Sequence, residues 1–171
     1  PEPIQQRLRL GRARVLVTTA SLHERKLAAI RSELPEPLDV LVVCDAGAHG
    51  VAAGTRDLEK LLAQSSDVAA IAQTGPQDPA LLHFTSGTTG TPKGALHVHE
   101  AALAHYASAR FALDLGPGDT YWCTADPGWV TGTSYGIVAP LLHGATLVVD
   151  EAEFDAERWY RILQDEQVQV W

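Results

Sequence analysis

Cysteines and long apolar runs, which would indicate a disulfide-rich, metal-binding or membrane protein, are scarce in this chain of 171 residues. It has two cysteines, Cys44 and Cys123, and their wide spacing fits neither a zinc site nor a disulfide framework. No run approaches the roughly 18 consecutive apolar residues of a membrane span, and no signal peptide is recognisable. We therefore expect a cytoplasmic protein with buried free thiols, and no contact with a membrane.

Positive charge is also scarce. The 13 Lys and Arg are outnumbered by 21 Asp and Glu, and the net charge of −8 argues against a nucleic-acid partner. Lysine is especially rare, because Lys93 alone lies between Lys60 and the last residue. A single lysine inside a glycine-rich run is better explained by local chemistry than by solubility.

Methionine is absent, even from position 1, and residues 168–171 (VQVW) have the pattern of a strand that has just begun. We therefore expect the chain to be an internal segment of a longer protein. Its content of 46% apolar and 20% charged residues is typical of a globular protein.

Short β-branched runs alternate with longer helical patterns, which predicts βαβ units, a largely parallel sheet with flanking helices, and an α/β fold. Ligands of such sheets bind at the carboxyl ends of the strands. Ser21 and Thr55 are the expected N-caps of the first two helices. Strands are expected at residues 13–19, 40–44, 81–84, 120–124, 145–150 and 168–171, an extended segment at 95–99, and helices at 21–34, 56–64, 100–115, 132–142 and 154–166.

The third expected strand runs into a glycine-rich loop, TSGTTGTPKG, at residues 85–94. Its glycines allow tight turns whose backbone N–H groups can hold an anion. Its hydroxyls and Lys93 can bind phosphate oxygens. It is not a Walker A loop, since Pro92 precedes the lysine and Gly94 follows it. A flexible, solvated loop is the alternative.

A second polar segment, DPGWVTGTSYG at residues 126–136, follows the expected strand at 120–124. Pro127 and Gly128 predict a turn, and the helix after it can present its N-terminus to a carboxylate or phosphate. Val130 beside Thr131 suits a short acyl group. The alternative, strongest for Trp129, is that the apolar residues belong to the core.

The loop TSGTTGTPKG resembles the phosphate-loop signature of the adenylate-forming enzymes, which include acyl-CoA synthetases, luciferases and peptide-synthetase adenylation domains. YWCTADPGWVTGTSY at 121–135 and HVHEA at 97–101 resemble the acetyl-CoA synthetase branch. The resemblance is dense over 81–171 and looser over 13–80. It implies one partial large N-terminal domain, in which 1–80 form a βαβα part and 81–171, truncated at the C-terminus, carry the phosphate loop and acyl pocket.

The resemblance implies that the parent protein activates a short carboxylate, acetate above all, with ATP and then transfers the acyl group to CoA, with Mg²⁺ at the phosphates. It assigns Trp129, Val130 and Thr131 to the acyl and CoA site. It places the catalytic lysine in a mobile C-terminal domain beyond residue 171, so we expect this segment alone to be inactive. The implied phosphate-binding residues are Thr85, Ser86, Gly87, Thr88, Thr89, Gly90 and Lys93.

Three alternatives remain open at this point. The chain can belong to a non-catalytic domain that binds a nucleotide or an acyl-adenylate, or to an enzyme that adenylates another carboxylic or amino acid. It can also be a parallel-sheet segment without a ligand.

His97 and His99 would need a third ligand to hold a metal, so we expect structural histidines and no metal site.

Overall fold

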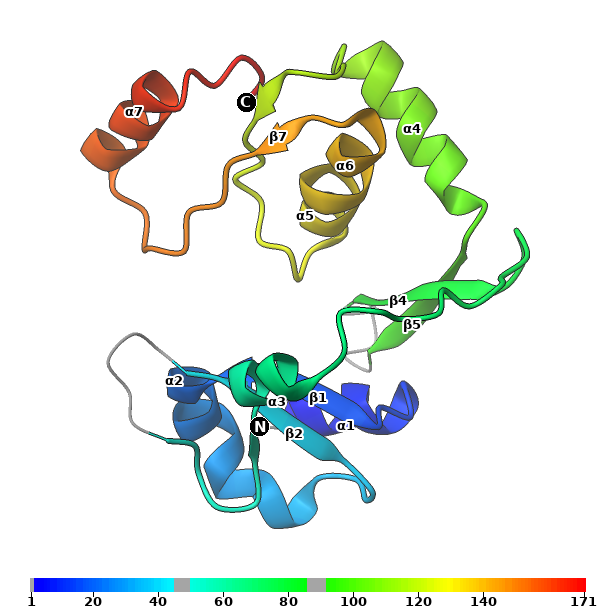
Figure 1. Ribbon diagram of the computed structural model, residues 1–171, viewed down its shortest axis with the longest axis vertical. Coiled ribbons are helices and arrows are strands. Elements are labelled where there is room, and N and C mark those ends of the chain that lie inside the picture. Colours follow the sequence, from blue (N-terminus) through cyan, green and yellow to red (C-terminus); the bar gives the residue numbers. More distant parts are fainter. Residues whose placement is uncertain (1, 45–49, 86–91) are drawn as a thin grey trace. The chain divides into compact units, whose positions relative to one another are not determined.

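Two parallel sheets and one hairpin organise the part of the chain that the structure describes, residues 2–44, 50–85 and 92–171 of a computed structural model (Figure 1). The chain divides into two units, residues 1–73 with 82–96, and residues 74–81 with 97–171. Helices accompany the parallel strands in both units, so the α/β class expected from the sequence is confirmed.

In the first unit, β1 (Val15–Thr19) and β2 (Asp39–Val43) pair in parallel over their full length, and β3 (Arg56–Asp57) pairs with the other edge of β2. The connection from β1 to β2 is helical, through α2 (Ala20–Leu22), the π-helical turn η1 (His23–Leu27) and the 3₁₀ helix η2 (Ala28–Glu33). This is the predicted βαβ unit. Its buried core consists of Leu27, Ile30, Leu34, Leu38, Val40 and Val42.

The helix starts in this unit differ from those predicted. α1 (Glu2–Leu10) was not predicted at all, although Ile4 and Leu8, spaced by four residues, pack against the core. The cap of α2 is Thr19, whose hydroxyl accepts a hydrogen bond from the Leu22 N–H at 3.3 Å, so the prediction of Ser21 was wrong.

The prediction of Thr55 as the next cap was also wrong. Residues 56 and 57 extend the sheet as β3, so α3 (Leu58–Gln64) begins two residues later than predicted. Asp57 caps it by accepting a hydrogen bond from the Lys60 N–H at 3.1 Å. That N–H, with the Lys60 side chain, lowers the pKa of Asp57.

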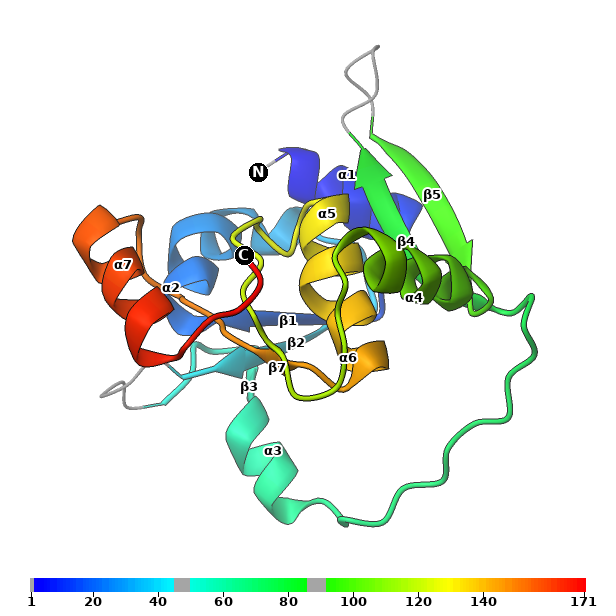
Figure 2. The same ribbon diagram turned by 90° about the horizontal axis from the view of Figure 1, so that it is seen from above.

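The glycine-rich loop joins β4 (Pro79–Thr85) to β5 (Lys93–Val98), which pair in a two-stranded sheet. Figure 2 shows the two arrows running in opposite directions. The predicted strand at 81–84 and extended segment at 95–99 are therefore confirmed, as a hairpin.

In the second unit, β6 (Thr120–Tyr121) pairs in parallel with β7 (Thr146–Leu147), and Tyr121 forms a parallel bridge with Val170. The strands predicted at 120–124 and 145–150 are therefore present but shorter, and the segment predicted as a strand at 168–171 forms only this isolated bridge. α4 (Ala101–Ala112) precedes β6, and α7 (Ala156–Asp165) leads from β7 to the bridge. Among the described residues, no helix is long and apolar enough to cross a membrane.

A continuous helical run connects β6 to β7. It comprises α5 (Val130–Thr133), the π-helical turn η3 (Ser134–Val138) and α6 (Ala139–His143), and it ends at Gly144, whose φ of +69° suits glycine. Figure 1 shows α6 beside β7 and α4. The core of this unit consists of Ala109, Leu115, Tyr121 and Ala139, and burial there raises the pKa of Tyr121 to about 12.

Candidate functional site

The glycine-rich loop is described only at its two ends. Thr85 is the last residue of β4 and Lys93 the first of β5, so both lie at the same end of the hairpin, and both are exposed. Pro92 is buried beside them. The remaining candidate phosphate-binding residues lie outside the described residues, and their roles stay predictions: Ser86, Gly87, Thr88, Thr89 and Gly90.

The predicted acyl segment is a turn tied to the start of a helix. Its closing hydrogen bond runs from the Trp129 N–H to the Asp126 carbonyl at 2.9 Å. The Asp126 carboxylate accepts a second bond from the Gly128 N–H at 2.6 Å. The Thr133 hydroxyl donates to the Pro127 carbonyl at 2.5 Å, which fastens the helix to the turn. Asp126 therefore has the structural role that its place in a Pro-Gly turn suggests.

The three residues assigned to the acyl and CoA site lie where the turn becomes the helix. Trp129 is the N-cap, and Val130 and Thr131 are the first helical residues, two positions earlier than the predicted start. Trp129 is 73% exposed and Val130 43%, so neither is a core residue in this chain. Exposed side chains on a fixed backbone are available to a ligand, which is what the assignment requires.

A cavity of about 450 Å³ opens beside this segment, in the second unit. It lies at the carboxyl ends of β6 and β7, where ligands of parallel sheets bind. Trp129, Val130 and Thr131 are not among its lining residues. The lining comes instead from residues 122–127, from Gly132, Gly136 and Ile137 of the helical run, from residues 147–153, and from Trp159.

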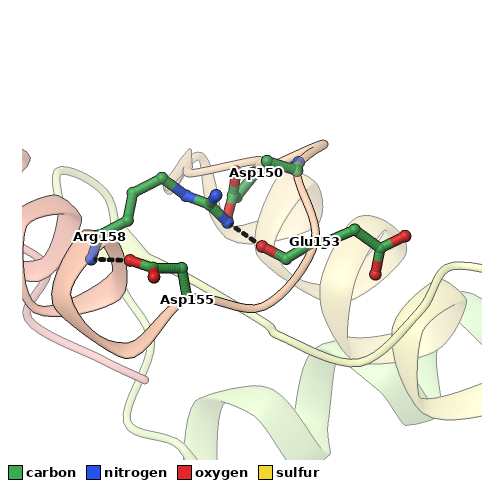
Figure 3. Close-up of polar contacts among 5 residues, drawn as sticks. Asp150, Glu153, Asp155 and Arg158 are labelled. Atoms are coloured by element: carbon green, nitrogen blue, oxygen red, sulfur yellow. Dashed lines mark hydrogen bonds and ion pairs between the residues drawn. The ribbon is translucent and has the colours of Figure 1, made fainter.

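One wall of the cavity is held by an ion pair that sequence reasoning missed. Arg158 Nη2 lies 2.7 Å from Asp150 Oδ2 and donates to the Glu153 carbonyl at 2.5 Å (Figure 3). The Asp150 carboxylate also accepts a bond from the Ala152 N–H at 3.1 Å. These two donors, the Ala152 N–H first, hold the pKa of Asp150 below its ordinary value against the effect of desolvation. Acidic residues gathered at 150–155 are typical of a solvated turn, but the Asp150 side chain is only 13% exposed.

Aromatic rings pack behind the same wall. The Trp122 and Trp159 ring centroids are 5.0 Å apart, and Phe154 meets Trp159 edge to face at 4.7 Å. Trp122 is 3% exposed. Trp159 belongs to α7 and Trp122 directly follows β6. These contacts therefore fix α7 and the segment before it against the chain that leads from β6 to the acyl turn, a use of aromatic packing typical of protein interiors.

The cysteines and histidines show no arrangement for nucleophilic or metal chemistry in the described ranges. Both cysteines are free and half-buried rather than fully buried. Partial burial first, and then the Asp57 and Glu59 carboxylates, raise the pKa of the Cys44 thiol, which makes it a poor nucleophile. Within the described residues no group of three or more His, Cys, Asp or Glu could hold a metal ion.

The family model for AMP-binding enzymes matches residues 1–171. A Bacillus subtilis (strain 168) protein named acetyl-coenzyme A synthetase is 44% identical over 168 residues, which cover 98% of this chain and 28% of that protein. A Stutzerimonas stutzeri (strain A1501) protein of the same name is 33% identical over 186 residues, covering 99% and 29%. The chain thus spans less than a third of the length of these relatives.

Known structures agree with the fold. A Brucella canis acyl-CoA synthetase superposes with a TM-score of 0.86 at 28% identity, over 98% of this chain and 30% of that one. An anthranilate CoA ligase in complex with anthranoyl-AMP superposes with a TM-score of 0.77 at 26% identity, over 88% of this chain and 29% of that one. An acetoacetyl-CoA synthetase from Streptomyces lividans superposes with a TM-score of 0.81 over 98% of this chain and 27% of that one. At 23% identity, this last likeness supports the fold alone.

Proposed function

The chain belongs to the family of AMP-binding enzymes, and we propose that it is part of the large domain of a cytoplasmic acyl-CoA synthetase that activates acetate. Residues 1–80 and 81–171 are both parts of that one domain. The observation that carries the proposal is the relationship, across nearly the whole chain, to proteins named acetyl-coenzyme A synthetase. The composition of the loop at 85–94, with its glycines, hydroxyls and Lys93, also supports it, because such an enzyme needs a site for polyphosphate.

In the first half-reaction a carboxylate oxygen attacks the α-phosphorus of ATP. A P–O bond forms to the carboxylate, the P–O bond to the β-phosphate breaks, and pyrophosphate leaves with the electron pair. The loop hydroxyls, the loop N–H groups and Lys93 stabilise the charge on the phosphates, because hydrogen-bond donors and cations lower the energy of negative charge that develops in the transition state. ATP enters as its Mg²⁺ complex, since Mg²⁺ binds mainly through substrate phosphates and water.

In the second half-reaction the CoA thiolate attacks the acyl carbonyl carbon of the adenylate. The C–S bond forms, the C–O bond to the phosphate breaks, and AMP leaves. Val130 and Thr131 hold the acyl group in both steps, and Trp129 supports the wall of its site. Their fixed position at the junction of turn and helix supports this assignment, because orienting the reacting groups lowers the barrier.

The test is carboxylate-dependent exchange of pyrophosphate into ATP by the full-length protein that contains this chain. We expect exchange with acetate to exceed exchange with propionate and butyrate, and acetyl-CoA to form once CoA is added. Exchange only with an aromatic acid or an amino acid would show that the enzyme activates that acid and not acetate. ATP binding without exchange for any acid would instead favour a non-catalytic nucleotide-binding domain.

Lys93 supplies a second test that is specific to the phosphate loop. Lys93→Ala removes a point charge, and we expect the KM for ATP to rise or kcat to fall by about 100-fold, a typical cost of losing one electrostatic contact to a transition state. Lys60→Ala is the matched control, because Lys60 is exposed and pairs with Asp57 at 3.3 Å on α3. Equal effects of the two substitutions would contradict the role of Lys93.

A further inference from the structure

Two glycines allow the helical run 130–143 to pack closely against the segment between β6 and the turn at 126–129. A Cβ atom at Gly132 would lie 2.1 Å from the Asp126 carbonyl oxygen, so no side chain fits there. A Cβ atom at Gly136 would lie 3.2 Å from Cys123 Cβ and 3.3 Å from Cys123 Sγ. The contact at Gly132 is with rigid backbone, so it excludes every side chain. The contact at Gly136 is with the Cys123 side chain, and a larger residue at 136 would push the helical run and the Cys123 segment apart by a few tenths of an ångström.

Gly136 lies in the middle of the π-helical turn Ser134–Val138, which the hydrogen bond from the Ala139 N–H to the Ser134 carbonyl closes. π-Helical turns inside α-helices occur frequently at functional sites. Gly136 and Cys123 both line the cavity at the carboxyl ends of β6 and β7. Their contact therefore borders that cavity, and it joins the segment after β6 to the helical run, whose first residue is Val130.

We infer that the Gly136–Cys123 contact positions the start of the helical run and thereby sets the acyl-chain preference of the enzyme. The inference rests on the proposed function. Packed interiors transmit displacement rather than absorb it, so a methyl group at position 136 displaces the helix, and Val130 and Thr131 move with it. Gly136 and Cys123 are positioning residues, because they act on the acyl group only through those two residues.

The experiment measures pyrophosphate exchange by the full-length protein with acetate, propionate and butyrate. Gly136→Ala is expected to raise the KM for acetate about tenfold, a fraction of the 100-fold that an ångström of misplacement can cost, and to change the ratio of kcat/KM between acetate and propionate. Cys123→Gly removes both atoms that the new methyl group would meet. The double variant Cys123→Gly with Gly136→Ala should therefore return to the ratio of Cys123→Gly alone.

Two controls separate positioning from general damage. Gly116→Ala is the matched glycine substitution, because the nearest atom to a Cβ there is Asp119 Oδ2 at 3.8 Å, and it should leave all constants within about twofold. The KM for ATP should also stay unchanged in Gly136→Ala, since a general loss of structure would raise both constants. Cys123→Val enlarges the other side chain of the same contact, so it provides a second test if Gly136→Ala does not fold.

The outcomes separate this inference from the proposed function. If wild-type protein shows no exchange with any carboxylate, the proposed function is wrong, and the inference fails with it. If the wild type is active, an unchanged acetate-to-propionate ratio in both Gly136→Ala and Cys123→Val overturns the inference alone. So does a double variant that fails to recover while Cys123→Gly by itself retains the wild-type ratio.

Discussion

Val130 is the residue whose side chain most directly tests the acyl site. It is the first residue of α5 and 43% exposed. Val130→Gly in the full-length protein removes three carbons from the proposed acyl site and so leaves room for a longer acid. We therefore expect the ratio of kcat/KM for butyrate to kcat/KM for acetate to rise about tenfold, the lower end of what one methylene changes in an apolar pocket. Pyrophosphate exchange across the acid series measures it.

The control for this substitution is Val68→Gly, at a valine that is 81% exposed and distant in sequence from the acyl segment. It tests whether loss of a valine side chain affects exchange in general, and we expect no change in acyl preference. If Val130→Gly and Val68→Gly both retain the wild-type substrate profile, Val130 does not line the acyl site.

Residues also mark the limit of what the sequence could predict. The turn at 126–129 was predictable because proline and glycine have strong local preferences, whereas most of the loop at 85–94 lies outside the described residues and its role stays a prediction. The roles of Gly136 and Arg158 could not be predicted, because each depends on a contact outside its own helix. Gly136 meets Cys123, and Arg158 pairs with Asp150. Gly132 and Gly136, four positions apart in a helical pattern, were the one available signal of a close approach.

At the scale of elements, the Asp150–Arg158 pair joins the end of the β7 segment to α7, with side chains 13% and 29% exposed. The pKa of Asp150 is lowered in the folded protein, so the pair stabilises the fold above the ordinary Asp pKa of about 3.9, and this is lost as pH falls through the lowered value. Asp150→Asn should therefore reduce amide protection of residues 150–158 at neutral pH, and the difference from wild type should narrow below about pH 4.

Hydrogen exchange of the full-length protein, corrected for the intrinsic effect of pH, measures that protection. Asp67→Asn is the control, since Asp67 is an exposed carboxylate on the connector after α3, and it should leave residues 150–158 unchanged. A difference between Asp150→Asn and wild type that is equally large at acidic and neutral pH would show that the charge of Asp150 does not hold this segment.

The elements themselves were predicted well in type and less well in extent. Hydrophobic runs in the sequence correctly located β1 and β2. In β2, Val40 and Val42 are each 1% exposed. The apolar runs at 120–124 and 145–150 are longer than the strands they contain, because only two residues of each pair with the neighbouring strand. α1 was missed because its helical pattern is short and mostly polar, and the apolar residues that fix it are recognisable only once the core is known.

At the scale of the whole molecule, the share of the enzyme that this chain represents bears on activity. The chain spans 28% of the length of the Bacillus relative, and the resemblance to the adenylate-forming enzymes implies a catalytic lysine in a mobile domain beyond residue 171. Under the proposed function, adenylation needs that lysine as well as the groups of this segment. We therefore propose that the segment binds its ligands only as part of the larger enzyme.

The corresponding prediction is that the 171-residue chain, purified alone, gives no acetate-dependent pyrophosphate exchange above the blank under conditions where the full-length protein is active. Circular dichroism of the isolated chain provides the necessary control, because helical and strand signals must be present for its inactivity to be informative. An equivalent amount of full-length protein carrying Lys93→Ala gives a second reference, with the C-terminal region present and the phosphate loop weakened. Exchange by the isolated chain above that reference would show that the loop at 85–94 and the turn at 126–131 suffice for adenylation, and would place the catalytic groups within this segment.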